Sequence, residues 1–250
     1  MNDAPRTSES QREQVLRRVR GMRLLRGADD ALVRELGQGA TLHRLARGER
    51  LWVRGTPAEH FYQVLRGVLE LRRATAGHEP TLVAFFGPGE CPAVPVALER
   101  KRFIADSFAT TGELEVLAIP SGPILERLPR DAALAGALNR ALLDHARLLH
   151  AKIDVLTAGP VPDRIATFLL DLAERFGDER EDGSVAIPLA LSRDQVASYV
   201  DARVETVIRC FSAWRREGLL VLESEATVLP SIDALGRTLG AERAPSRRRD

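Results

Sequence analysis

One segment of the sequence limits the possible folds more than any other, because residues 131–156 contain no proline and a single glycine. Leucines recur along this segment with a spacing of three and four residues, which predicts one long amphipathic helix with a heptad-like stripe. Such a stripe could pack on its own domain, but the heptad period favours pairing with a second copy of the chain. We expect a parallel homodimer with an interface formed by Leu134, Leu138, Leu142, His145, Leu149 and Leu156.

The motif Gly-Pro-Val-Pro at residues 159–162 ends this helix, because proline cannot continue a helix as an interior residue. We therefore place a domain boundary there and expect the second domain to begin near Val161. Before the helix, short β-rich runs alternate with glycines, which predicts an antiparallel barrel or jelly roll. The expected strands are 41–45, 50–53, 61–65, 68–72, 81–86, 103–109 and 114–119. Residues 11–36 have the spacing of a helix that packs on this barrel.

Composition and charge exclude several classes of protein. The two cysteines, Cys91 and Cys210, cannot form a disulfide framework or a four-cysteine metal site. No run is apolar enough to span a membrane, and the polar N-terminus has no apolar signal region, so we expect a soluble cytoplasmic protein without a membrane partner. The net charge of only +1 means that any nucleic-acid interface must come from local placement of basic residues.

The region after residue 161 alternates predicted helices and short strands. Helices are expected at 163–176, 192–199 and 203–217, and strands at 185–188, 219–222 and 227–229. Ser192 followed by Gln195 is a capping-box pair, which predicts that a helix begins there. Asp201 and Ala202 fit a tight turn between two short helices. This arrangement is typical of a helix-turn-helix.

The second helix of this pair carries side chains suited to reading double-stranded DNA. An arginine matches the two acceptors of guanine, a glutamate accepts from the cytosine amino group, and an aliphatic side chain can contact a thymine methyl group. The expected base-reading residues are Arg203, Val204, Glu205, Ile208 and Arg209, and the expected phosphate contacts are Arg193, Arg215 and Arg216. The alternative is that these exposed residues are merely solvated.

Three segments together resemble the Crp/Fnr family of bacterial transcription regulators. They are RGERLWVRGTPAEHFYQVLRGVLEL (47–71), DRIATFLLDLA (163–173) and LSRDQVASYVDARVETVIR (191–209), and the resemblance extends over roughly residues 24–240. It implies an α+β fold with a cyclic-nucleotide-binding-like β-roll, a dimerisation helix and a winged helix-turn-helix. The implied ranges are 1–15 (disordered tail), 16–130 (sensor roll), 131–158 (dimerisation helix), 161–240 (DNA-binding domain) and 241–250 (disordered tail).

The resemblance also implies how DNA is read. Glu205 and Arg209 match the family's pair of base-reading residues, and Val204 before the glutamate is similar to the Fnr branch, which implies a palindrome with TTGA-like half-sites. The sequence departs from that branch at Ile208 and Arg203, which puts the base preference in doubt. Family members also contact RNA polymerase, the second partner that the resemblance implies.

The sensor roll lacks the residues with which the family holds cyclic AMP. Val94 stands where the ribose-binding glutamate is expected, and Ile104 and Ala105 stand where the phosphate-binding arginine pair is expected. A buried phosphate requires charge-assisted donors, so we expect no cyclic nucleotide ligand. The alternative is that a shifted loop brings Arg100 or Arg102 to the phosphate.

An Fnr-type iron–sulfur cluster is also excluded, because no cysteine precedes Cys91. The chain then resembles the cysteine-free Dnr/Nnr branch, which implies sensing of nitrogen oxides through haem. An apolar pocket of Cys91, Val94, Pro95, Val96, Ile104, Ala105 and Phe108 would suit haem, another apolar ligand or no ligand. The candidate axial ligands are His43, His60, His78, His145 and His150.

A jelly roll can also carry a cupin-like metal enzyme, which is the alternative class for this chain. Cupins need a His-x-His pair, whereas His60 is followed two residues later by Tyr62. No nucleophile motif or glycine-rich phosphate loop is present either. We expect a regulator without enzymatic activity and without a bound metal.

Overall fold

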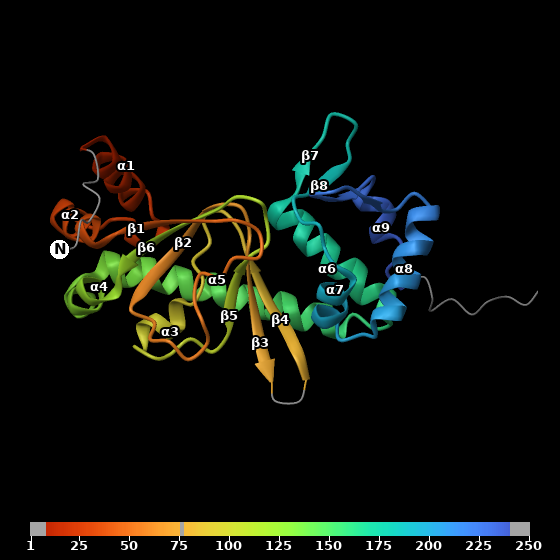
Figure 1. The fold of residues 1–250 in the computed structure, drawn as a ribbon, viewed down its shortest axis with the longest axis horizontal. Coiled ribbons are helices and arrows are strands. Elements are labelled where there is room, and N and C mark those ends of the chain that lie inside the picture. Colours follow the sequence, from red (N-terminus) through yellow and green to blue (C-terminus); the bar gives the residue numbers. More distant parts are fainter. Residues whose placement is uncertain (1–8, 76–77, 241–250) are drawn as a thin grey trace, which may run out of the picture. The chain divides into compact units, whose positions relative to one another are not determined.

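The computed structural model describes residues 9–75 and 78–240, which form two compact units (Figure 1). Residues up to 73 and residues 84–146 belong to the first unit, and residues 74–83 and 147 onward belong to the second. The division therefore falls inside the long helix, before the domain boundary that the sequence predicts near Val161. The reason is that the C-terminal part of the helix packs on the second unit, where Val155 is fully buried.

The first unit is a β-roll of two three-stranded antiparallel sheets. One sheet has the order β1 (Thr41–Leu45), β6 (Leu114–Pro120), β2 (His60–Arg66), and the other has the order β4 (His78–Phe86), β3 (Leu69–Thr75), β5 (Asp106–Ala109). Short helices α3 (Val94–Leu98) and α4 (Ser121–Arg127) follow β4 and β6. A 3-10 turn, Leu128–Arg130, then leads into the long helix α5 (Ala132–Thr157). The predicted all-β module is confirmed.

Trp52 explains why the strand expected at residues 50–53 is absent. Its backbone N–H donates to the Ser107 hydroxyl at 2.9 Å rather than to a carbonyl, and Arg50 makes only an isolated bridge with Phe108. The Trp52 indole N–H donates to the Ala105 carbonyl at 3.1 Å. Backbone hydrogen bonds also join the segment to β5, from the Leu51 N–H to the Ser107 carbonyl and from the Ser107 N–H to the Trp52 carbonyl, both at 3.2 Å. The segment therefore runs beside β5 without forming a regular ladder.

The predicted helix at 11–36 is two helices, α1 (Glu9–Arg20) and α2 (Asp30–Gly39), with a 3-10 turn at Arg23–Leu25 between them. Both helices contact β6, as expected of this region. Residues 9–15, expected in a disordered tail, lie in α1, whereas residues 1–8 and the expected tail 241–250 lie outside the described residues.

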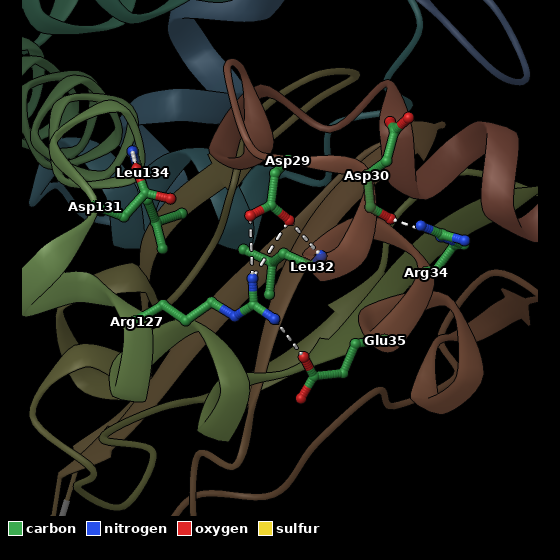
Figure 2. A network of polar contacts seen from close by, with 8 residues as sticks. All are labelled: Asp29, Asp30, Leu32, Arg34, Glu35, Arg127, Asp131 and Leu134. Atoms are coloured by element: carbon green, nitrogen blue, oxygen red, sulfur yellow. Dashed lines mark hydrogen bonds and ion pairs between the residues drawn. The ribbon is translucent and has the colours of Figure 1, made fainter.

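Asp29 and Arg127 tie α2 to α4 in the network of Figure 2. The Asp29 carboxylate caps α2 by accepting from the Leu32 N–H at 2.7 Å, and this hydrogen bond, helped by Arg127, holds the pKa of Asp29 below its usual value. The Arg127 guanidinium lies 3.3 Å from Asp29 and 2.9 Å from Glu35. The network fixes the helical layer beside the roll.

The second unit is a winged helix-turn-helix. Helix α6 (Val161–Phe176) is followed by α7 (Arg193–Val200) and α8 (Val204–Arg216). The wing is a four-stranded sheet in the order β7 (Asp178–Glu179), β8 (Val185–Ile187), β10 (Thr227–Leu229), β9 (Val221–Leu222), and α9 (Ile232–Gly236) ends the unit. Residues 78–83 of β4 also belong to this unit, and the Leu82 N–H donates to the Ser198 hydroxyl of α7 at 2.9 Å.

Candidate nucleic-acid interface and sensor roll

Helix α8 has one buried face and one exposed face. Val207, Cys210, Phe211 and Trp214 are buried against the rest of the second unit. The predicted base-reading side chains Arg203, Glu205, Ile208 and Arg209 are exposed, and Val204 is half-buried beside them. The structure therefore brings all five predicted base-reading residues to the N-terminal half of one helix, as a recognition helix requires.

The helix-turn-helix turn is built from caps and a left-handed residue. The Ser192 hydroxyl accepts from the Gln195 N–H at 3.0 Å, and the Gln195 side chain accepts from the Ser192 N–H at 2.9 Å, which confirms the predicted capping box. Asp201 then adopts φ 52°, ψ 63° and turns the chain into α8. Tyr199 stacks on Phe168 of α6 with ring centres 4.3 Å apart, which fixes α7 on the unit's core.

Helix α8 begins without a side-chain cap at Arg203. The first N–H groups of a helix carry partial positive charge and bind phosphate well. Within α8, Arg209 donates to the Thr206 hydroxyl at 3.3 Å, a contact that limits the directions of its guanidinium. The start of α8 therefore offers both anion-binding backbone and an oriented arginine.

The three predicted phosphate contacts differ in their surroundings. Arg215 and Arg216 are exposed in the last turn of α8. Arg193 is half-buried, its guanidinium lies 4.2 Å from the centre of the Phe211 ring, and burial together with Arg215 lowers its pKa. Arg193 thus contributes to packing as well as to the positive charge of this face.

The predicted sensor-pocket residues differ in their burial. Val94 is fully buried at the first position of α3, and Ala105 is buried, as expected. Ile104, however, is 59% exposed, and Phe108 lies between the guanidinium groups of Arg50 and Arg72 at 5.1 and 5.2 Å. Ile104 and Ala105 lie in a bend just before β5, and Ile104 is exposed and Phe108 half-buried where Ala105 is buried, so they do not share its buried surroundings. Their assignment to the same pocket is wrong.

The roll interior holds an aromatic cluster that the sequence analysis missed. Trp52 stacks on Phe103 at 4.5 Å between ring centres and meets Tyr62 at 4.9 Å. Burial raises the pKa of Tyr62, helped by Glu59. These aromatic residues come from three segments far apart in the chain, and only their bulk within β-rich runs could have indicated them.

Cys91 of the predicted pocket and His145 are candidate haem ligands whose pKa values are shifted by burial. Burial raises the pKa of the Cys91 thiol to about 12, so it is protonated at neutral pH, and its sulfur lies 3.9 Å from the Gln63 side-chain oxygen. His145 stacks on Phe86, burial lowers its pKa, and its Nδ1 is buried without a hydrogen-bond partner among the described residues.

The residues present do not fit a haem group. Two of the seven predicted pocket residues do not share the buried surroundings of Ala105, and the Cys91 thiol is protonated. Of the other candidate ligands, His43 and His60 lie on β1 and β2, His150 is exposed, and the side chain of His78 lies outside the described residues. Apart from the question of haem, the described ranges contain no group of three His, Cys, Asp or Glu side chains that could hold a metal ion.

The predicted interface residues of α5, from Leu134 to Leu156, lie in two different environments. Leu134 and Leu138 are only 1% and 2% exposed and are already covered within the chain, whereas His145 is half-buried and packs on Phe86. Leu142 is half-buried, whereas Leu149 is 54% exposed and Leu156 is also exposed. Two exposed residues of the same helix, Leu143 and Ile153, were missed. The apolar stripe therefore runs along the whole of α5, but only the residues of its C-terminal half remain exposed within one chain.

A β-roll joined by a long helix to a winged helix-turn-helix, with arginine and glutamate on the exposed recognition face, defines a DNA-binding regulator with a sensor domain. A model of the Crp-like helix-turn-helix domain matches residues 163–238, and a model of the cyclic nucleotide-binding domain matches residues 42–131. The chain belongs to the Crp/Fnr family of transcription regulators. It is a DNA-binding transcription regulator, as predicted.

The nitrogen fixation regulation protein FixK of Azorhizobium caulinodans is 28% identical over 186 residues, covering 74% of this chain and 73% of its own. The CRP-like cAMP-activated global transcriptional regulator of Mycobacterium tuberculosis is 24% identical over 192 residues, with 76% and 84% covered. The solved structure of FixK2 from Bradyrhizobium japonicum has the same fold, with a TM-score of 0.67, 22% identity and 79% and 96% covered. None of the described helices is long and apolar enough to cross a membrane.

Proposed function

We propose that this regulator acts in the cytoplasm as a homodimer on a palindromic DNA site, with RNA polymerase as its second partner. The observation that carries the proposal is the exposed face of α8, where Glu205 and Arg209 lie four residues apart beside Val204 and Ile208. Two such helices related by a two-fold axis would enter successive major grooves about 34 Å apart. Each half-site would then be read by the same residues.

The C-terminal half of α5 supports the dimer. Leu142, Ala146, Leu149, Ile153 and Leu156 follow a spacing of four, three, four and three residues, the pattern of a coiled-coil seam. Leu149 and Ile153 are exposed, and burying them against a second copy would remove apolar surface from water. This seam replaces the longer one expected from the sequence.

The proposed site is a TTGA-like palindrome, supported by the match of Val204, Glu205 and Arg209 to the Fnr branch. Binding-site selection on random duplexes tests it directly. We expect enrichment of a palindrome whose half-sites contain a guanine opposite Arg209, because an arginine fork pairs with two guanine acceptors. Recovery of only single, unpaired half-sites or of no motif would contradict the proposal.

We further propose that the roll acts without cyclic nucleotide. Val94 and Ala105 are buried and apolar, and Arg102 donates to the Gly55 carbonyl at 2.7 Å, away from the predicted pocket. Arg100 is exposed in a left-handed conformation with φ 52°. The alternative in which a shifted loop supplies a cation therefore has no support from either arginine.

Haem, and with it the nitric-oxide sensing implied by the Dnr/Nnr branch, is left out of the proposal because the predicted pocket residues do not share the same buried surroundings. We expect freshly purified protein to have no Soret band in its visible absorption spectrum. A Soret band that persists through gel filtration would contradict this and would restore the haem hypothesis.

A further inference from the structure

Lys152 is one of only two lysines in a chain whose other basic residues are arginines. It lies in the C-terminal part of α5 and is half-buried. Its ammonium donates a hydrogen bond to the Tyr199 carbonyl and lies 3.4 Å from the centre of the Tyr199 ring. A cation over an aromatic face and a charge-assisted hydrogen bond both favour this position. Lys152 thus joins α5 to α7, the first helix of the helix-turn-helix pair.

The carbonyl that Lys152 holds belongs to the end of α7, where the last carbonyls have no partner within the helix. Arg164 of α6 donates to the next two carbonyls, those of Val200 and Asp201, at 2.9 and 3.0 Å. Cations are favourable at this end of a helix because it carries partial negative charge. One of the two cations comes from within the DNA-binding helices, and the other comes from the proposed dimer helix.

The covalent connection between α5 and α6 contains a glycine, whose backbone has more freedom than that of any other residue. Only Ala158, Gly159 and Pro160 separate the two helices, and Gly159 has φ 111°, a conformation that only glycine adopts readily. A chain that can pivot at this glycine needs side-chain contacts to hold one angle. The Lys152 contact with Tyr199 is such a contact, and buried Val155 one turn later supports it.

We propose that Lys152 is a positioning residue that sets the angle between α5 and the helix-turn-helix, and thereby selects the spacing between two DNA half-sites. The inference rests on the proposed function, since spacing has meaning only for a dimer on a palindrome. In such a dimer, the angle at which each recognition helix leaves the paired α5 helices determines the separation of the two half-sites. Base reading within each half-site depends on α8 and is unaffected.

The test measures affinity for a series of duplexes in which the two half-sites are one, two or three base pairs closer or farther apart, together with a duplex carrying one half-site. We expect Lys152→Met to lose about tenfold in affinity at the optimal spacing, because fewer molecules hold the required angle. It should lose much less at the other spacings, so the preference for one spacing shrinks. Binding to the single half-site should match the wild type.

Lys152→Arg keeps a cation and a donor and should restore most of the spacing preference. Lys101→Met is the matched control, because Lys101 is exposed and pairs with Glu99 on the roll. Equal losses at every spacing, or loss of single half-site binding in both Lys152→Met and Lys152→Gln, would mean a general structural role and overturn the inference. A wild type without any spacing preference would instead contradict the proposed dimer on a palindrome.

Discussion

Arg209 is the residue on which sequence readout depends most. It is exposed on α8 and oriented by Thr206, so it can present two parallel N–H groups to a guanine. Glu205, one turn earlier on the same face, complements it as an acceptor for cytosine. Arg215 and Arg216 in the last turn of α8 can contribute charge but lie beyond the half of the helix that reaches base edges.

We predict that Arg209→Ala costs about 1–3 kcal/mol of binding free energy and relaxes the preference at one base pair in each half-site. Arg215→Ala is the matched control: it should weaken binding to all sequences equally and reduce the salt dependence, because phosphate contacts carry no base information. Fluorescence anisotropy on the selected site and on single-base variants, at two salt concentrations, measures both effects. An unchanged base preference in Arg209→Ala would show that Arg209 does not contribute to base recognition.

His145 links pH to the stability of the first unit. Burial lowers its pKa, and the buried Nδ1 has no partner among the described residues, so the native state disfavours the charged imidazole. A depressed pKa contributes stability above the unfolded-state value near 6.5, and this stability is lost as the pH falls through the native-state pKa. Acid should therefore destabilise the unit through this residue.

We predict that the free energy of unfolding falls more steeply between about pH 7 and pH 5 in the wild type than in His145→Leu. Urea unfolding followed by circular dichroism at several pH values measures the difference. His150→Leu, an exposed position on the same helix, should follow the wild type. Since burial also lowers the pKa of His43, some acid sensitivity should remain in every variant. Parallel curves for the wild type and His145→Leu would refute the prediction.

Among the elements, α5 is the one with the most varied surroundings, because its residues belong to two compact units and also form the proposed dimer seam. Its N-terminal leucines, Leu134 and Leu138, are covered by the first unit, and its C-terminal apolar residues are exposed. The helix begins at a cap in which the Asp131 carboxylate accepts from the Leu134 N–H at 2.9 Å. The proposed seam therefore occupies only the second half of the element.

We predict that the double variant Leu149→Asp, Ile153→Asp dissociates the dimer, because each carboxylate would be buried without a partner at the seam. Multi-angle light scattering should give the monomer mass for the variant and twice that mass for the wild type. Ile104→Asp is a suitable control, since this exposed isoleucine lies on the roll. An unchanged mass in the double variant would exclude the seam.

Local signals in the sequence predicted most elements, including β1 and β10 with the bounds the structure gives them. Strand alternation and the Ser192 capping box are such signals. Helices α3 and α4 were missed because each is short and contains a proline near its start, which resembles a loop. The free face of α5 could not be predicted, because it depends on contacts such as Phe86 with His145 that no local pattern encodes. The pocket prediction was wrong at Ile104 for the same reason, because the exposure of this side chain depends on tertiary contacts.

For the whole molecule, the question is what signal the roll passes to the DNA-binding unit. The roll has the fold of a cyclic nucleotide-binding domain without its anion-binding residues. The side chains of Val94 and Ala105 are buried and offer no hydrogen-bond donor to a ribose hydroxyl or a phosphate. Burying a phosphate without donors would cost roughly several kcal/mol of binding free energy, as for other buried charges. On the proposed function, the roll therefore keeps the family fold but does not bind cyclic nucleotide.

We predict that cyclic AMP and cyclic GMP produce no binding heat at concentrations up to about 1 mM, a limit that corresponds to roughly 4 kcal/mol of affinity. Isothermal titration calorimetry is the measurement, with the selected DNA duplex titrated into the same preparation as the control for active protein. DNA affinity should also be the same with and without either nucleotide. A micromolar dissociation constant would show that another group in the roll receives the phosphate.

The length of α5 also has a mechanical consequence. Its 26 residues span about 39 Å at a rise of 1.5 Å per residue, and a single helix of this length acts as a lever arm. A tilt of only about 5° at the end held by the roll would displace the far end by about 3.4 Å, close to the rise of one base pair. A rearrangement of a few side chains in the roll could thus be amplified into a one-base-pair change at the DNA.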